Sequence, residues 1–406
     1  MRYEGKPIVS ITRNEDIILA VKSCLDQLKI PDLTGKNVLL KPNVGREALP
    51  NSGINTNPEV VSAIFNYLKE RYNAQYYIGD SPIINTDTKK AFEKYGYSEL
   101  LKDESIHFID LDDKPPIEKE IPQGKILKSI KLTGYWKDFD YIISIPVLKM
   151  HMHCGASLSF KNLKGLIYKR NKVALHHFQS PEIISHYNKN EKSIKIKELD
   201  VAIADFANLV YPDLAIIDAS IAHEGMGPSS GNPVRLNTII ASTSSLAADI
   251  IALAISQPTW TLDDVPHLKL ISESLFPSLK SFKDIKTIPQ NIEEFIHPLK
   301  PSPESITIKY KNVILTDIDS CSACLSTIFK LLENNIGFIS KHFTEKNPLR
   351  IAIGKGIKQS DLYSDMFLVG NCTSSLNKYK TGVFIKGCTP TESIIMQLIK
   401  ENLKVN

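Results

Sequence analysis

Short apolar runs alternate along the first two thirds of the chain with stretches whose apolar residues recur at helical spacing. The runs NVLLKPN (37–43) and YIISIPVLK (141–149) predict buried strands that end in polar or proline-containing turns. Between them, 57–72 predicts a helix with Asn57 as its N-cap and Pro58 at its first position. Strands that alternate with helices favour an α/β fold: a mostly parallel sheet with flanking helices.

The alternation continues to about residue 255, with a helix at 196–210, a strand at 214–220, a Gly/Pro loop at 223–233, a strand at 236–243 and a helix at 244–255. From 256 to about 312 the pattern weakens, and the Pro-, Lys- and Ser-rich stretch 278–305 predicts a connection between domains. Four apolar runs and two amphipathic stretches follow, and they predict a smaller C-terminal α/β domain. We therefore expect a substrate-binding domain over 1–300 and a metal-binding domain over 301–406.

Composition adds limits on the class of protein. The 406 residues are 42% hydrophobic and 23% charged, with a net charge of +4, as in an ordinary globular protein. The charge forms no basic stripe, so we expect no nucleic-acid partner. The start of the chain has no apolar signal-peptide core, and no run is long enough to span a membrane. These features predict a cytoplasmic protein with no membrane partner.

The cysteines supply the most specific chemical signal. Six cysteines in a chain of this length are too few for a disulfide scaffold. Four of them form the pattern C-x2-C-x47-C-x15-C: Cys321, Cys324, Cys372 and Cys388. Thiolate sets of this kind select iron–sulfur clusters or zinc, and one paired C-x2-C with two scattered cysteines favours a [4Fe–4S] cluster. Zinc is the alternative, and a redox disulfide or plain core thiols remain open.

A second dense signal is the stretch 145–178, which is rich in lysine and histidine: Lys149, His151, His153, Lys161, Lys164, Lys169, Arg170, Lys172, His176 and His177. His151 and His153 alternate, which places both on one face if the segment is extended. Lys161 and Lys164 are one helical turn apart. Such a set favours a small anionic substrate, with histidine as an acid–base group or a metal ligand. The alternative is a solvated basic loop with histidines satisfied in the core.

Polar residues at the ends of other predicted strands add candidates for the same sheet edge: Lys41, Asn43, Asp80, Ser81, Asp218, His223 and Glu224. Ligands of open α/β sheets bind at the carboxyl ends of the strands. Each residue alone is an ordinary turn former.

Several motifs together resemble the bacterial and archaeal family of domain of unknown function 362: LLKPNVG, TNPEVVSAIFNYL, IGDSP, AFEKYGY, IISIPVLKMHMHCGASLSFKNLKGL, PDLAIIDASIAHEGMGPSSGNP and SSLAADIIA. They cover roughly residues 35–256 in a specific order. The resemblance implies iron–sulfur cysteines in an additional segment. This tail departs from the ferredoxin-like form, because it lacks a C-x2-C-x2-C run.

The segment HMHCGASLSFKNLKGL, with the later HH, is also similar to the nickel-pincer lactate racemase family. The resemblance places His151, Lys161 and His177 at that family's histidine, tethering lysine and second histidine. Two departures stand out: LSF replaces the small residues before the lysine, and GDSP stands where a further histidine is expected. We expect a shared fold and pocket location without the nickel cofactor.

These signals predict an iron–sulfur oxidoreductase of anaerobic type that holds a small anionic substrate at an interdomain cleft. The expected catalytic residues are Lys149, His151, Lys161, His177, Asp80, Asp218 and Glu224. The expected substrate-binding residues are Lys41, Asn43, His153, Asn162 and Lys164. An electron donor such as ferredoxin would serve the cluster, and Asp218 or Glu224 would pair with Lys161. The alternatives are a non-redox isomerase or lyase of a hydroxy or oxo acid, and an electron carrier or accessory metalloprotein without turnover.

Overall fold

The computed structural model describes residues 6–83, 86–169, 171–176, 178–188, 196–302 and 310–403. The chain divides into two compact units. Unit 1 comprises the residues up to 224 together with 232–300, and unit 2 comprises 225–231 together with the residues from 301 onward. The loop 225–231, which the sequence pattern assigns to the first domain, therefore packs with the second.

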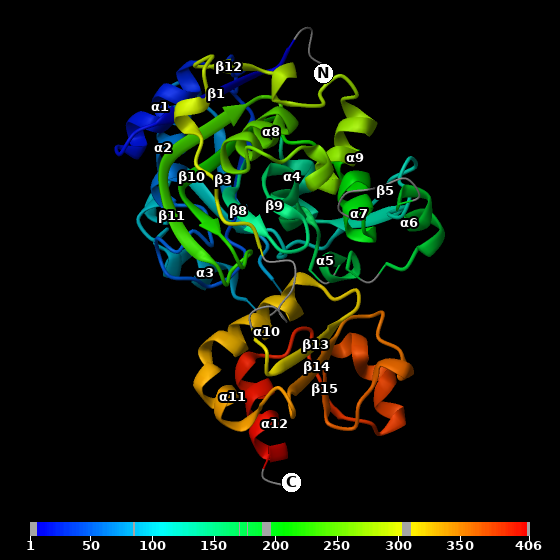
Figure 1. Cartoon of the computed structure of the whole chain (residues 1–406). Coiled ribbons are helices and arrows are strands. Elements are labelled where there is room, and N and C mark those ends of the chain that lie inside the picture. The colour runs from blue at the N-terminus through cyan, green and yellow to red at the C-terminus, as the bar shows by residue number, and fades with distance from the viewer. Residues whose placement is uncertain are drawn as a thin grey trace. The chain divides into compact units, whose positions relative to one another are not determined.

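Unit 1 is built on a large, mostly parallel sheet (Figure 1). Its strands are β1 (Ile8–Arg13), β2 (Asn37–Pro42), β3 (Gln75–Asp80), β4 (Ile106–Asp110), β7 (Tyr141–Ile145), β8 (Val147–His151), β9 (Gly155–Ser157), β10 (Leu214–Glu224), β11 (Asn232–Ser242) and β12 (Lys286–Ile288). The main order is β12-β1-β11-β10-β7-β2-β3-β4, and β8 joins β10 and β9. Only the pairings of β11 with β1 and β10, and of β8 with β9, are antiparallel. A separate ribbon pairs β5 (Ile117–Glu120) with β6 (Ser129–Leu132).

Helices cover both faces of this sheet, which confirms the predicted fold class. One core forms beneath α1 (Ile17–Asp26), α2 (Pro58–Lys69) and α3 (Thr88–Tyr95). The other forms beneath α4 (Ser159–Asn162), α7 (Glu198–Ala207), α8 (Ser245–Ser256) and α9 (Pro266–Leu275). The shorter helices of this unit are α5 (Asn171–Ala174), α6 (Pro181–Asn188) and the 3₁₀ turns η1 (Leu100–Lys102), η2 (Gly134–Asp138), η3 (Leu163–Leu166), η4 (Leu262–Asp264), η5 (Phe282–Asp284) and η6 (Glu293–Phe295).

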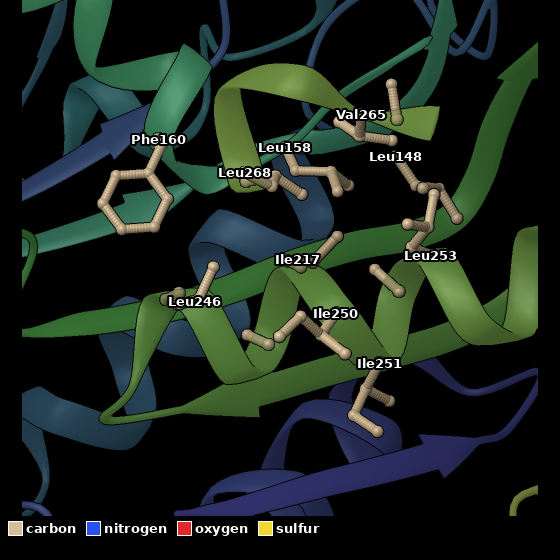
Figure 2. Packing of buried hydrophobic residues seen from close by; sticks show 14 of the residues in the cluster. Leu148, Leu158, Phe160, Ile217, Leu246, Ile250, Ile251, Leu253, Val265 and Leu268 are labelled. Atoms are coloured by element: carbon tan, nitrogen blue, oxygen red, sulfur yellow. The ribbon is translucent and has the colours of Figure 1, made fainter. Parts of the chain in front are cut away.

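Local sequence explains why the principal helices form where they do. The Asn57 side chain accepts a hydrogen bond from the backbone N–H of Glu59, and Pro58 follows as the first helical residue of α2. Ser244 caps α8 in the same way. Helix α8 is apolar around most of its circumference because it is buried on nearly all sides. Figure 2 shows its Leu246, Ile250 and Leu253 in the cluster that also contains Ile217 of β10.

The prediction of an interdomain connection over 278–305 is wrong up to residue 300, because these residues belong to unit 1. Strand β12 lies in this stretch, and helix α9 lies just before it. Strand β12 pairs in parallel with β1, and Phe295 and Leu299 are buried in the core. A strand of three residues is too short to produce a periodic pattern, which is why the sequence did not reveal it.

Unit 2 contains a second, wholly parallel sheet in the order β13-β14-β15-β16. Its strands are β13 (Val313–Asp317), β14 (Leu349–Ile353), β15 (Met366–Val369) and β16 (Val383–Ile385), and its helices are α10 (Ser322–Asn334), α11 (Ile336–His342), α12 (Glu392–Leu403), η7 (Gln359–Asp361) and η8 (Asn371–Tyr379). Helices α10, α11 and α12 lie together beside this sheet (Figure 1). The expectation of a smaller C-terminal α/β region is therefore confirmed. Within the described ranges, no helix has both the length and the apolar character needed to cross a bilayer.

Candidate functional site

Lys41 and Asp80, predicted to lie at one sheet edge, form a buried ion pair. They come from the adjacent parallel strands β2 and β3, and Lys41 Nζ lies 2.7 Å from Asp80 Oδ1. Lys41 Nζ also donates to Asn162 Oδ1 at 3.2 Å, while Asp80 Oδ2 accepts from the Val44 backbone N–H. Burial lowers the pKa of Lys41, and the Asp80 charge opposes this effect. Asn162 returns a bond to the Lys41 carbonyl, so the network is internally satisfied.

Gly165 of η3 packs directly on this ion pair. A Cβ atom at this position would lie 2.0 Å from Asp80 Oδ1 and 2.6 Å from Lys41 Nζ, closer than real atoms approach. The absence of a side chain is therefore what allows η3 to close over the pair. Nothing in the sequence marks Gly165 for this role.

Lys149 is buried without a carboxylate partner. It lies in β8, and its ammonium donates to Asn43 Oδ1 at 2.6 Å and to the Ile54 carbonyl at 2.8 Å. Both acceptors are neutral, and no carboxylate of the described chain forms an ion pair with it. Burial holds the pKa of Lys149 well below its usual value, and the nearby charges of Lys161 and Arg46 lower it further.

Two histidines follow Lys149, but they do not share an extended segment. Strand β8 ends at His151, and the chain turns through residues 152–154 into the antiparallel β9. The expectation that both rings lie on one strand face is therefore wrong at His153. His151 Nδ1 accepts from the His153 backbone N–H at 3.1 Å, which leaves the ring proton on Nε2 when the imidazole is neutral. Burial and Lys161 hold the pKa of His151 well below its usual value, and burial lowers that of His153 to about 3.

Lys161 in α4 lies next to these groups. Within the part of the chain that the structure describes, its ammonium forms no hydrogen bond or ion pair. Burial lowers its pKa, and the acidic groups that raise it are Cys154 and Asp200. Among the described residues, Lys161 forms no ion pair with its expected partners, Asp218 and Glu224. Lys164, one turn later in η3, lies 3.0 Å from His176 Nε2.

We call Arg46, Lys149, His151, His153, Lys161 and His223 the basic group. His223 of β10 stands beside Lys149 in the β10–β8 register, and burial followed by the Lys149 charge lowers its pKa to about 4. Burial lowers the pKa of Arg46, whose charge also acts on His223. Like charges gathered in a partly buried site repel one another, so the basic group favours an anion.

The remaining predicted acids, Asp218 and Glu224, have hydrogen-bond partners in other parts of the fold. Asp218 accepts from the Asn57 backbone N–H at 2.7 Å and from Ser220, and burial raises its pKa. It lines a cavity of about 290 Å³, whose described lining includes no lysine or histidine. Glu224 accepts from the Lys300 backbone N–H at 2.9 Å. His177 lies outside the described residues.

In unit 2, three of the four tail cysteines form a hydrogen-bonded set. Cys321 and Cys324 stand at the start of α10, and Cys372 stands at the start of η8. Hydrogen bonds with Cys321 and Cys372 raise the pKa of Cys324, and the bond from Cys324 lowers that of Cys372 to about 7. Among the described residues no cysteine forms a disulfide, and Cys24 and Cys154 belong to unit 1.

Gly370 lies against this set and connects it to the fourth cysteine. A Cβ atom there would lie 3.2 Å from Cys324 Sγ and 3.4 Å from Cys372 Sγ, and the φ of +100° also suits glycine. The backbone N–H of Asn371 donates to the Gly387 carbonyl at 2.8 Å, and its side chain accepts from Gly387 N–H. Residues 387–388 are thereby held beside Cys372. Two sulfurs lie against Gly370, and several thiols in one region are the kind of donor set that an iron–sulfur cluster uses.

A further group of metal-ligating side chains escaped the sequence analysis. Cys154, Asp200 and His267 are all buried in unit 1, and their ligand atoms lie within 4.8 Å of one another. They come from three separate elements far apart along the chain. Asp200 and His267 each resemble ordinary polar residues of a first helical turn, so no spacing in the sequence joins them.

Comparison with known families gives one match over the core of unit 1. The family model described as domain of unknown function (DUF362) matches residues 38–254, just over half of the 406 residues. A curated relative, a thylakoid-associated protein of Synechocystis, is 27% identical over 223 residues, which are 55% of this chain. The match spans 64% of that relative, just under two thirds of its length.

Two solved structures show distant similarity. The lactate racemase apoprotein of Thermoanaerobacterium thermosaccharolyticum is 14% identical with a TM-score of 0.39, over 59% of this chain and 55% of that one. A protein from Thermotoga maritima is 13% identical with a TM-score of 0.36, over 67% and 61% of the two chains.

Proposed function

Because the chain belongs to the family of domain of unknown function DUF362, we propose its activity from the chemistry of its own residues. The proposal is an iron–sulfur oxidoreductase that acts on a small anionic substrate, such as a hydroxy or oxo acid. Unit 1 would bind the substrate, and unit 2 would bind a [4Fe–4S] cluster through Cys321, Cys324, Cys372 and Cys388. A reducing compartment, the cytoplasm, suits the free thiols.

The observation that carries the substrate class is that Lys149 and Lys161, two buried lysines of the basic group, form no ion pair with a carboxylate of the described residues. Lys149 contacts only neutral acceptors, and Lys161 has no hydrogen-bond partner among the described side chains. The neighbouring Lys41 shows the contrast, since it is paired with Asp80. Burying an ammonium group without a counterion is costly, and a carboxylate or phosphate of the substrate would offset that cost.

The residues divide into three roles under this proposal. Lys149 and Lys161 bind the anionic group of the substrate. His151, whose Nδ1 is held as an acceptor, presents Nε2–H as a proton donor to a substrate oxygen. Lys41, Asp80 and Asn162 hold the ends of β2 and β3 in place, and Asn43 positions Lys149. We assign Asp218 and Glu224 no contact with this substrate, because each is engaged elsewhere.

The cysteines of unit 2 support the redox half of the proposal. Three of their thiols already contact one another, and Gly370 leaves room beside two of the sulfurs. A [4Fe–4S] cluster, when bound, supplies one-electron transfer. Reduction of an oxo acid to a hydroxy acid takes up two electrons and two protons, so a donor such as ferredoxin would supply the electrons one at a time, and a hydroxy acid would return them to the cluster when the reaction runs in reverse. Zinc bound by the same cysteines would instead leave a non-redox enzyme.

The test adds candidate acids to anaerobic protein that carries the cluster. A hydroxy acid that is a substrate should bleach the visible absorption, and the Lys149→Met variant should keep its colour but lose the bleaching. An isomerase or lyase would exchange the α-proton of the acid for solvent deuterium, seen by NMR, without any bleaching. An electron carrier would be reduced by ferredoxin, but added acids would neither bleach its absorption nor exchange their α-proton. Either of the last two results would overturn the oxidoreductase assignment.

A further inference from the structure

We propose that Cys154, Asp200 and His267 form a site for one divalent transition metal inside unit 1, separate from the four cysteines of unit 2. The site would be a three-ligand site of mixed sulfur, oxygen and nitrogen donors. It does not rest on the proposed oxidoreductase function, because it uses none of the residues assigned to the cluster or to the substrate.

The fold brings the three side chains together at one point. Cys154 lies in the turn between β8 and β9, Asp200 in the first turn of α7, and His267 is the second residue of α9. Helices α7 and α9 pack on each other. Gly155, with a φ of +71°, brings the turn against the start of α9, since a Cβ there would lie 2.9 Å from the Asp264 carbonyl.

Polar atoms in this group are buried without partners. Asp200 Oδ2 accepts from the Lys197 backbone N–H, as expected of a residue in a helix cap, but Oδ1 has no partner among the described residues. Neither ring nitrogen of His267 has one either, and Nδ1 lies 4.0 Å from Asp200 Oδ1. An unpaired buried polar atom costs about 1–3 kcal/mol, so Asp200 Oδ1 and a ring nitrogen of His267 call for a ligand that both can bind. The helix cap accounts for the burial of Asp200, but it does not account for the buried, unpartnered ring of His267.

The donor set selects the class of ion. A thiolate, an imidazole and a carboxylate together suit Zn²⁺ and its neighbours in the first transition row rather than Ca²⁺ or Mg²⁺. In a tetrahedral site these donors would stand about 3.3–3.8 Å apart. The three ligand atoms lie within 4.8 Å of one another, so side-chain movements of roughly 1 Å would bring them to these distances. Three protein ligands leave one position open, as in catalytic zinc sites.

Charge balance is compatible with a cation here, although lysines are near. The charges of Lys161 and Lys197 act on both Cys154 and Asp200, and that of Lys161 acts on His267. A thiolate and a carboxylate together neutralise a divalent ion. Lys161 is therefore the member of the basic group whose charge acts on this site as well as on Lys149 and His151.

The test uses the full chain with Co²⁺ as the probe. Protein reconstituted anaerobically with iron and sulfide is dialysed against Co²⁺ and then against buffer. We expect one retained cobalt per chain, with tetrahedral visible bands and a sulfur-to-metal band from a single thiolate. Cys154→Ser, Asp200→Asn and His267→Gln should each weaken cobalt binding at least tenfold. Cys24→Ser, another buried thiol of unit 1, and the exposed His107→Gln should leave it unchanged.

Each outcome decides the proposal. No retained cobalt, or cobalt retained equally by Cys154→Ser and Asp200→Asn, overturns it, and a water would then fill the group. Should the variants fail to fold, as judged by circular dichroism, X-ray absorption on the unsubstituted protein decides. One sulfur with nitrogen and oxygen neighbours supports the site, whereas an all-sulfur or sulfur-free shell overturns it. An all-sulfur signal would mean that cobalt sits at the four cysteines.

Discussion

The ammonium of Lys149 lies 2.6 Å from the side-chain oxygen of Asn43, a neutral acceptor, in a site where its neighbours are other cations. The nearby Lys41 has the opposite arrangement, with Asp80 at 2.7 Å. Two buried lysines of one sheet edge thus differ in whether the protein supplies the counterion. Our proposal rests on this difference: Lys41 is neutralised within the fold, whereas an anionic ligand would supply the counterion of Lys149.

Replacing Lys149 by methionine should weaken anion binding. A charge-assisted hydrogen bond contributes about 1.5–3 kcal/mol, so affinity for the anion should fall roughly 10- to 150-fold. Isothermal titration with lactate, pyruvate and inorganic phosphate measures this directly. Lys22→Met, at an exposed position of α1, is the matched control and should bind as the unsubstituted protein does. Equal binding by both variants would remove Lys149 from the site.

Anion binding should also be coupled to proton uptake. Burial and neighbouring cations lower the pKa of Lys149 in the free protein, and a bound anion would raise it again. Binding therefore favours the protonated amine, and affinity should fall as pH rises through the lowered pKa of the free protein. Titrations in buffers of different ionisation enthalpy measure the protons taken up. Affinity that is constant or rises with pH would contradict this picture.

Removing the counterion of Lys41 should destabilise the fold. Asp80→Ala leaves a buried, unpaired ammonium, which typically costs about 3–5 kcal/mol. Glu47→Ala breaks the exposed pair with Lys94 and should cost less than about 1 kcal/mol. Urea denaturation compares the two free energies of unfolding. Similar losses in both variants would mean that the Lys41–Asp80 pair is not the buried network described here.

Asp249 should make stability depend on pH in the acid-to-neutral range. It accepts from the backbone N–H groups of Ser159 and Phe160, and burial raises its pKa to about 7. A carboxyl group with a raised folded-state pKa favours folding at low pH, so its contribution is lost as pH rises from about 4 to 7, by up to about 4 kcal/mol.

The variant Asp249→Asn cannot ionise and should lack this part of the pH dependence. Its free energy of unfolding relative to the unsubstituted protein should be more favourable at pH 8 than at pH 5, as measured by urea denaturation. A difference that stays constant between these pH values would show that Asp249 does not titrate in this range.

The alternation of apolar runs and amphipathic stretches was sufficient to predict the parallel strands and their helices, because each pattern is local. The Asn57 cap and the strands on either side of α2 follow from residues adjacent in sequence. The strand at 236–243 was predicted, but its antiparallel direction and the short β12 were not, since the partners of β11 and β12 in β1 are distant along the chain. Direction within a sheet is decided by connections and packing, which a local pattern does not contain.

The candidate site shows the same limit at the level of side chains. The Lys/His stretch could be recognised because its residues lie close together in sequence. The acid that acts on Lys161 could not, since Asp200 reaches it only through the packing of α7. Gly165 and His267 likewise gain their roles from contacts across the fold.

Counting iron and acid-labile sulfide per chain, in protein purified without oxygen, tests the central claim most directly. The account predicts a brown protein with about four iron and four sulfide per chain, as one four-cysteine cluster requires. Cys324→Ser should lose the colour and both elements, whereas Cys24→Ser, a buried thiol of unit 1, should retain them. A colourless protein that holds zinc and no sulfide would contradict the iron–sulfur assignment and the oxidoreductase proposal with it.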